Sequence, residues 1–143
     1  MTQELNREIT PESIRERIDG SFPGDLGIEP VEISAGRAVG RMLVDRRHLH
    51  PGGYVHGGAW VALADSVAAW GTFRNLPPGH DFTTIELKLN VFAAAGPGDE
   101  LVATAEPQHL GRRTQVWEVR VHREQRPVAL FTVTQFVLAP GED

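Results

Sequence analysis

One long apolar segment constrains the fold of this chain more than any other feature of its sequence. Ala, Leu, Val and Trp dominate residues 59–73, and Asp65 carries the only charge in that stretch. A helix that is apolar on nearly all sides must be buried on nearly all sides. We therefore expect a buried central helix that ends at Asn75–Gly79, with the remaining secondary structure wrapped around it.

The segments on either side of this helix are typical of strands. Residues 28–44 alternate in polarity around the turn Ser34-Ala35-Gly36, which predicts a β-hairpin. Further strands are predicted at residues 82–92, 101–107, 114–122 and 127–138, with a turn at residues 109–113 between the second and third of them. Runs of strands beside one or two helices indicate the α+β class with a largely antiparallel sheet. The prediction is six strands around one long helix.

Alternation within residues 82–92 assigns side chains to two faces. One face is predicted to carry Ile85, Leu87, Leu89 and Val91, and the other Thr84, Glu86, Lys88 and Asn90.

A short N-terminal helix is predicted before the sheet. Thr10 suits the N-cap position and Pro11 the first helical position, and the helix should run to about Ile18. A length of 143 residues fits one domain. We expect a single domain over residues 1–143, with its core at about 25–138 and an N-terminal helical segment at 1–24.

Composition excludes several classes of function. The chain has no Cys, so it has neither a thiolate nucleophile nor a Cys-based metal site. Its 6 His show no ligand spacing, and we expect no metal and no redox cofactor. A formal net charge of −5 argues against binding nucleic acid. No apolar run approaches the roughly 20 residues that span a bilayer, and the polar N-terminus is no secretory signal, so a cytoplasmic location is expected.

Asp65 is the residue of the central helix that most needs an explanation. Its neighbours three and four positions away cannot neutralise a carboxylate; they are Val61, Ala62, Ala68 and Ala69. Burying an unpaired charge is costly, so such an acid is often retained for function. The alternative is an Asp near the helix surface that is hydrogen-bonded to backbone or to a loop.

A glycine-rich loop, residues 50–58, leads into the helix. Gly57 and Gly58 expose backbone N–H groups at its N-terminus, where the helix dipole favours an oxygen that acquires negative charge. A plain glycine-rich turn is the alternative. Gly57 and Asp65 are eight residues apart, which is roughly 12 Å along a helix. One helix therefore cannot easily supply both groups to one carbonyl, whereas two antiparallel copies across a two-fold axis can, and the active unit would be a dimer.

Three motifs carry a resemblance to a known family. They are His50-x-x-Gly53-x-x-His56-Gly57-Gly58 followed by Leu63-Ala64-Asp65, then Ile85-Glu86-Leu87-Lys88-Leu89-Asn90, then His109-Leu110-Gly111-Arg112-Arg113-Thr114-Gln115-Val116-Trp117. Together they resemble the hotdog-fold acyl-CoA thioesterases, in particular the phenylacetate-pathway, 4-hydroxybenzoyl-CoA, dihydroxynaphthoyl-CoA and enterobactin-pathway enzymes. The resemblance covers roughly residues 25 to 138.

The resemblance implies catalytic roles for five positions, His50 and the four that follow. Asp65 would attack the thioester carbonyl or activate a water against it, and the Gly57 N–H would polarise that carbonyl. His56 would shape the loop or help to place the water. Thr84 would assist at the start of the third strand, with Thr83 as the adjacent alternative.

Other positions match or depart from the family. His50 stands where relatives commonly have Asn or Gln; a neutral imidazole still donates one hydrogen bond, but it titrates near neutral pH. Ala69 stands where some relatives have a hydroxyl that holds the water. Arg112, Arg113 and Thr114 would contact the CoA portion of the substrate, since guanidinium groups suit phosphates. A solvated hairpin tip is the other interpretation of the two arginines.

The leading hypothesis is hydrolysis of an acyl-CoA thioester, with an aromatic acyl group favoured, to the carboxylic acid and free CoA. A homodimer is the expected minimum and a homotetramer the expected assembly. Two alternatives stay open: a hotdog hydratase or dehydratase of acyl thioesters that uses His50 or His56, and a non-catalytic acyl-CoA-binding module. Trp60 and Trp70 are assigned to core packing or to an acyl pocket, and His48 to the surface or a turn.

Overall fold

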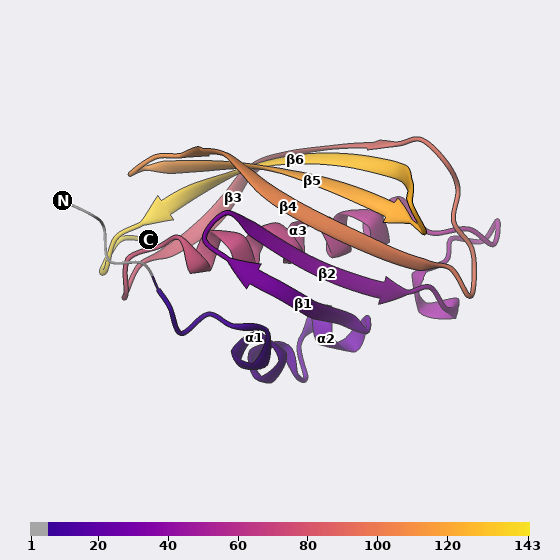
Figure 1. Cartoon of the computed structure of the whole chain (residues 1–143), viewed down its shortest axis with the longest axis horizontal. Helices are drawn as coiled ribbons and strands as arrows, with labels where there is room; N and C mark the ends of the chain where they lie inside the picture. The colour runs from indigo at the N-terminus through magenta and orange to yellow at the C-terminus, as the bar shows by residue number, and fades with distance from the viewer. Residues whose placement is uncertain (1–5) are drawn as a thin grey trace.

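The computed structural model describes residues 6–143, and six of their strands form one antiparallel sheet curled around the helix α3 (Figure 1). In chain order the elements are α1 (Pro11–Ile18), α2 (Phe22–Asp25), β1 (Ile28–Ser34), β2 (Arg37–Leu43), η1 (Arg46–His48), α3 (Gly57–Arg74), β3 (Asp81–Val91), β4 (Glu100–Leu110), β5 (Thr114–Arg123) and β6 (Arg126–Leu138). The strand order in the sheet is β1-β2-β4-β5-β6-β3. The predicted α+β architecture, a sheet wrapped around one long helix, is confirmed.

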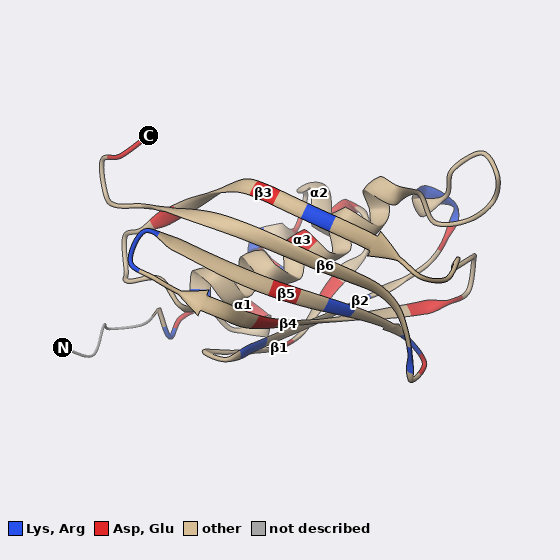
Figure 2. Ribbon diagram, turned by 90° about the horizontal axis from the view of Figure 1, so that it is seen from above, with Lys and Arg blue, Asp and Glu red and all other residues tan. Residues whose placement is uncertain are grey.

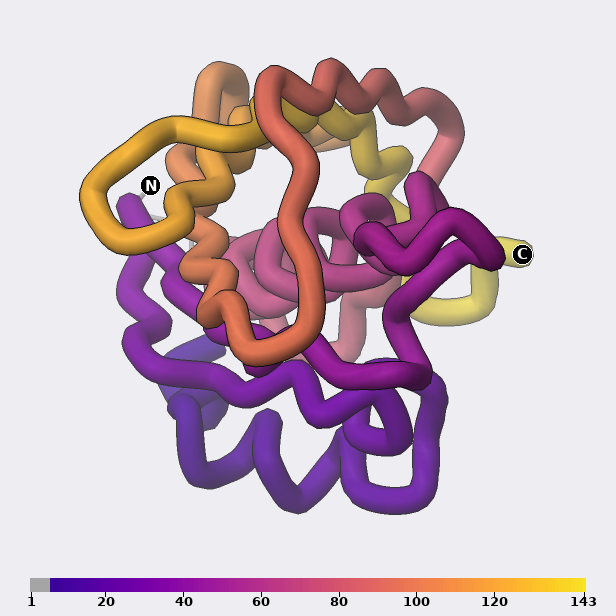
Figure 3. The backbone as a smooth tube through the Cα atoms, turned by 90° about the vertical axis from the view of Figure 1, so that its right-hand side faces the viewer, coloured from indigo at the N-terminus to yellow at the C-terminus, as the bar shows by residue number. Residues whose placement is uncertain are grey.

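α3 lies inside the curve of the sheet, as the end-on view shows (Figure 3). The inward side chains of the strands are apolar and fully or almost fully buried against it; they include Ala38, Met42, Leu101, Ala103, Trp117, Val119, Phe131 and Val133. Two glycines let helix and sheet approach closely. A Cβ at Gly71 would lie 2.6 Å from the Trp117 ring, and one at Gly40 would lie 2.6 Å from Val67. Among residues 6–143, no helix has the length and apolar character that crossing a bilayer requires.

The two edges of the sheet differ. β1 packs against α1 and α2, which lie outside it. β3 forms the opposite edge of the sheet (Figure 2), and β6 is the strand with which it pairs. Ile85 of β3 is 58% exposed, and Leu87, Val91 and the adjacent Phe92 are exposed too. An exposed apolar edge strand is a template for pairing with another chain.

A β-bulge interrupts β3 and corrects the predicted faces of this strand. Thr84 lies opposite Gln135, but Glu86 lies opposite Thr134, so Ile85 is the additional residue. Because side chains alternate along a strand, one extra residue reverses the alternation. Thr84 therefore shares the helix-facing side with Leu87 and Leu89, and not the outer side with Glu86, as simple alternation had predicted.

The remaining elements largely follow the predictions. Thr10 caps α1 through Ser13, and Pro11 is its first residue. β4 extends through Leu110, so the predicted turn at residues 109–113 is shorter than expected. A bulge between Pro107 and His109 lets β4 keep its pairing with β5. The short helix α2 and the 3₁₀ helix η1 were not predicted, because neither is long enough for an apolar period to develop.

The contact between Gly71 and Trp117 makes a testable prediction about stability. Gly71→Ala should lower the free energy of unfolding by about 1–2 kcal/mol, because overpacking a core costs more than the helix propensity that Ala adds. Chemical denaturation measures this difference. Gly36→Ala is the control, since its Cβ would meet open space and the change should stay within about 0.5 kcal/mol. A Gly71→Ala protein as stable as the wild type would contradict the packing described here.

Candidate active site

The loop before α3 is held by its own histidines. His56 is the N-cap of α3, and its Nδ1 accepts a hydrogen bond of 2.8 Å from the Gly58 N–H. Its backbone N–H donates to the carbonyl of His48. The Gly57 N–H makes no hydrogen bond to any of residues 6–143. Gly57 therefore presents a free donor at the positive end of the helix dipole, as predicted for an oxygen-binding position.

A hollow of about 350 Å³ opens beside this donor. Its lining consists of the start of α3, the loop before it and the segment at the end of β3: His50, Tyr54, Val55, Gly57, Trp60, Val91, Phe92, Ala93 and Ala94. The Nδ1 of His50 accepts from the Gly52 N–H at 2.9 Å. A neutral imidazole that accepts at Nδ1 carries its proton on Nε2, so His50 retains one donor. The hollow is thus mainly apolar, with donors at His50 and Gly57.

Asp65 lies two turns further along α3 and is half-buried. Its Oδ1 is buried without a hydrogen-bond partner among the described residues. Burial raises the pKa of this carboxyl, and the Thr84 hydroxyl, which lies beside it, acts in the opposite direction. A partly desolvated carboxyl with a single hydroxyl neighbour holds its proton to a higher pH than a solvated carboxyl does.

The bulge in β3 is what brings Thr84 to Asp65. It turns Thr84 toward α3, while Thr83 is exposed on the outer side. Thr84 donates to Gln135 Oε1 at 2.7 Å. Of the two candidate threonines, the structure therefore places only Thr84 beside the carboxyl.

The predicted site residues fall into separate groups within one chain. His50, His56 and Gly57 gather at the N-terminus of α3, whereas Asp65 pairs with Thr84 and does not line the hollow. Eight residues of helix separate Gly57 from Asp65, which corresponds to roughly 12 Å. One chain consequently does not bring the oxygen-binding donor and the carboxylate to a common point.

Arg112, Arg113 and Thr114 form a third group at the β4–β5 hairpin. The hairpin lies at the left in Figure 1, at the opposite end of α3 from the loop that precedes this helix. Both arginines are exposed. Arg113 lies 3.6 Å from Glu142 and stacks over the Phe136 ring, with 5.2 Å between the guanidinium carbon and the ring centroid.

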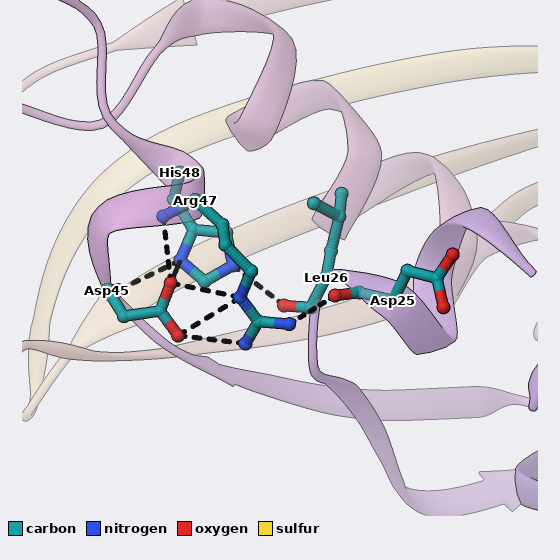
Figure 4. Close-up of polar contacts among 5 residues, drawn as sticks. All are labelled: Asp25, Leu26, Asp45, Arg47 and His48. Carbon is teal, nitrogen blue, oxygen red and sulfur yellow. Dashed lines mark hydrogen bonds and ion pairs between the residues drawn. The ribbon is translucent and has the colours of Figure 1, made fainter. Parts of the chain in front are cut away.

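His48 lies in the interior, so its assignment to the surface was wrong. It is 1% exposed; its Nδ1 accepts from the Asp45 N–H at 2.9 Å and its Nε2 lies 2.7 Å from the Leu26 carbonyl oxygen (Figure 4). Arg47 beside it donates to the Asp45 carboxylate from its guanidinium and from its backbone N–H, and these hydrogen bonds lower the pKa of Asp45 to about 2. The Arg47 guanidinium also donates to the Asp25 carbonyl. The cluster ties the loop that leads to His50 to the segment after α2.

Two buried glutamines were not singled out from the sequence. Gln115 and Gln135 lie opposite each other on β5 and β6, on the side that faces α3. A signal for Gln135 was present, because it interrupts the inward apolar series Phe131, Val133 and Val137 at period two. Two aromatic residues of the lining gave no comparable signal: Tyr54 lies in the loop before α3, and Phe92, predicted as the last residue of a strand, lies just beyond the end of β3.

The comparisons with known proteins agree with this geometry. The family model of the thioesterase superfamily matches residues 52–130. The chain belongs to the thioesterase superfamily. As a member of this superfamily it is a thioester hydrolase, and the predicted hotdog fold is confirmed.

Individual relatives of this thioesterase cover most of its length. A 1,4-dihydroxy-2-naphthoyl-CoA hydrolase of Listeria monocytogenes is 36% identical over 99 residues, which is 69% of this chain and 80% of the relative. The proofreading thioesterase EntH of Cronobacter turicensis is 29% identical over 119 residues, 83% of this chain and 86% of the relative. The crystal structure of a Haemophilus influenzae thioesterase superposes with a TM-score of 0.88 at 26% identity and covers 99% of this chain and 98% of that one.

The raised pKa of Asp65 predicts how its replacement alters stability with pH. The pKa of Asp65 in the native state lies above its value of about 3.9 in the unfolded state. The ionised carboxyl therefore destabilises the fold at a pH above the native pKa, and this destabilisation is absent at a pH below the unfolded pKa. Asp65→Asn should therefore raise the free energy of unfolding at pH 7, and this gain should shrink toward pH 4. Urea denaturation at both pH values and one fixed protein concentration measures it. A loss of stability at pH 7, or a gain independent of pH, would contradict the assigned environment.

Proposed function

We propose that this thioesterase hydrolyses acyl-CoA thioesters to the carboxylic acid and free CoA, with Asp65 as the catalytic carboxylate. The observation that carries the proposal is the half-buried Asp65, whose Oδ1 has no partner among the described residues and whose neighbour is the Thr84 hydroxyl. An uncompensated carboxyl in an apolar helix is costly to keep, so it is best explained by chemistry. The names of the relatives, among them dihydroxynaphthoyl-CoA hydrolase, support a CoA thioester as substrate.

In this proposal the active site is shared between two copies of the chain. One copy supplies the hollow, where the Gly57 N–H polarises the thioester carbonyl and His50 donates a further hydrogen bond. The second copy supplies Asp65 and Thr84. His56 keeps the loop closed by capping α3, and this assigns it a supporting part.

The edge strand β3 supports this arrangement. Its exposed Ile85, Leu87 and Val91 leave an apolar margin that a second β3 would cover by antiparallel pairing. Such pairing sets the two α3 helices antiparallel, so that the N-terminus of each lies beside the later turns of the other. An active monomer in sedimentation analysis would contradict the shared site.

The same pairing accounts for the remote arginines. α3 has 18 residues. It is therefore about 27 Å long, and Arg112 and Arg113 of one chain lie at the far end from its own hollow. The antiparallel partner would bring its β4–β5 hairpin, with Thr114, to that hollow. There the guanidinium groups would meet the CoA phosphates.

Aromatic residues around the hollow favour an aromatic acyl group. Trp60 is buried and lines the hollow, and Tyr54 and Phe92 border it and are exposed. Trp70 is buried and does not line it. Ring faces and edges suit an aromatic acyl chain through stacked or edge-to-face contacts. A homotetramer and a cytoplasmic location stay predictions.

Two chemical routes fit the proposed site. In one, the Asp65 carboxylate removes a proton from water, the water oxygen bonds to the carbonyl carbon, and the C–S bond breaks to release the thiolate of CoA. In the other, Asp65 bonds to the carbonyl carbon directly, and water then hydrolyses the anhydride. We favour the first route, because an Asp side chain is short. In a single turnover in ¹⁸O-water, label in the Asp65 carboxylate identifies the anhydride route with water attack at the Asp65 carbonyl; attack at the acyl carbonyl puts the label into the product in either route.

Thiol release from a panel of aromatic and aliphatic acyl-CoA esters tests the proposed function. The wild type should turn over at least one ester, aromatic esters best, and Asp65→Asn should lower kcat by about two orders of magnitude or more. Asp19→Asn is the matched control, because Asp19 is exposed at the end of α1 and should leave kcat unchanged. Turnover that survives Asp65→Asn would contradict the role of the carboxylate. No turnover on any ester would contradict the proposed substrate.

A further inference from the structure

Gln135 is a polar side chain at a position that packing alone would make apolar. Its inward neighbours on β6, Val133 and Val137, are buried hydrophobics, and Gln135 itself is 0% exposed. Its Oε1 accepts from Thr84, but its Nε2 is buried without a partner among the described residues. A buried amide that is half-satisfied is costly and calls for a specific reason.

The glutamine opposite it on β5 has an ordinary structural explanation. Gln115 is equally buried; its Oε1 accepts from the Trp117 indole at 2.9 Å, and its Nε2 donates to the Asn75 carbonyl at 3.4 Å. Both polar ends of that amide are therefore used to hold the Trp117 ring and the end of α3. Gln135 is not explained in this way, because its one partner is the hydroxyl beside Asp65.

Thr84 has one proton to donate and two acceptors within reach. With the Gln135 amide as it stands, that proton goes to Oε1, and both Asp65 Oδ1 and Gln135 Nε2 have no partner among the described residues. Rotating the amide by half a turn exchanges its oxygen and nitrogen. Nε2 then donates to the Thr84 oxygen, and the Thr84 hydroxyl is free to donate to the carboxylate. The rotation gives Nε2 an acceptor and frees the Thr84 hydroxyl for the carboxylate, while Oε1 loses its Thr84 donor.

We propose that Gln135 is a positioning residue for catalysis: its amide donates to Thr84, which in turn donates to Asp65 and holds the carboxylate ionised and oriented. This inference rests on the proposed function of Asp65. When Asp65 takes up a proton, it no longer needs the Thr84 donor. The Gln135 amide then rotates back, and the Thr84 hydroxyl donates to Oε1 as it does in the structure.

No charged group competes with this chain of hydrogen bonds within the part of the protein that the structure describes. The causes that shift the pKa of Asp65 are burial and Thr84 alone. The inward positions of β2, β4, β5 and β6 are uncharged. The charged residues on the other elements that pack against α3 are exposed or face outward; they are Asp25 on α2, Glu29 and Glu32 on β1, and Asp81, Glu86 and Lys88 on β3. Arg74 lies nine residues along α3 from Asp65.

Gln135→Met, which keeps the volume and removes the donor, tests the proposal. Without the Gln135 donor, Thr84 supports the carboxylate less well, and the pKa of Asp65 should rise by about one unit. The acidic limb of the kcat/KM profile should move to higher pH by the same amount, which is about a tenfold loss of activity on that limb. Carbon-13 NMR titration of the Asp65 carboxyl should show the same shift. Because that readout needs no turnover, failure of the proposed function and failure of this inference are distinguishable.

Two controls separate positioning from structural support. Gln115→Met removes an equally buried amide from the same row and should leave the Asp65 titration unchanged. In a Thr84→Val background, Gln135→Met should have little further effect, because Gln135 acts through Thr84. An unchanged Asp65 titration in Gln135→Met, or an equal shift in Gln115→Met, would overturn the proposal.

A measurement on the unaltered protein covers the case in which Gln135→Met does not fold. The side-chain amide nitrogen of Gln135 should titrate together with the Asp65 carboxyl, and that of Gln115 should not. A Gln135 amide signal that is indifferent to the Asp65 titration would also overturn the proposal.

Discussion

Burial of α3 on nearly every side is the constraint on which the rest of the structure depends. The helix is enclosed by a curved sheet, so the inward strand positions must be apolar, and the closest ones must be small, as at Gly40 and Gly71. In such an interior the one carboxylate, Asp65, has no charge to pair with. Its pKa rises, and its surroundings have to supply whatever polar contact it has. The raised pKa of Asp65, on which its proposed catalytic role depends, and the fold thus have the same physical origin.

The polar contact comes from a local irregularity of the sheet. Regular alternation along β3 would direct Thr84 outward with Glu86, but the bulge at Ile85 reverses the alternation and turns Thr84 toward the helix. Gln135 lies directly opposite on β6 and completes a short polar row in an otherwise apolar interior. Among the described helix-facing positions of β3 and β6, only Thr84 and Gln135 carry a hydroxyl or amide group.

The sequence predicted the elements whose physics is local and periodic. The apolar run at 59–73, the Thr10-Pro11 helix start and the Ser34–Gly36 turn each specify their structure within a few residues, and all three predictions were confirmed. Residues that depend on tertiary structure were harder to predict. The sequence of β3 alternates regularly through Ile85, so the pattern gives no sign of the bulge at that residue. The burial of His48 depends on the Leu26 carbonyl, which is distant in the sequence.

Complementation between two inactive variants tests whether the active site is shared between two copies of the chain. Gly57→Pro removes the free N–H with little distortion: proline suits the first helical position, His56 has the extended backbone (φ −64, ψ 142) that precedes proline, and a Cβ at Gly57 meets open space. Gly57→Pro and Asp65→Asn are unfolded, mixed in equal amounts and refolded. A site built from two copies predicts recovery of about a quarter of wild-type thiol release, because half of the dimers are mixed and each has one intact site. A mixture no more active than the mean of the two variants would contradict the shared site.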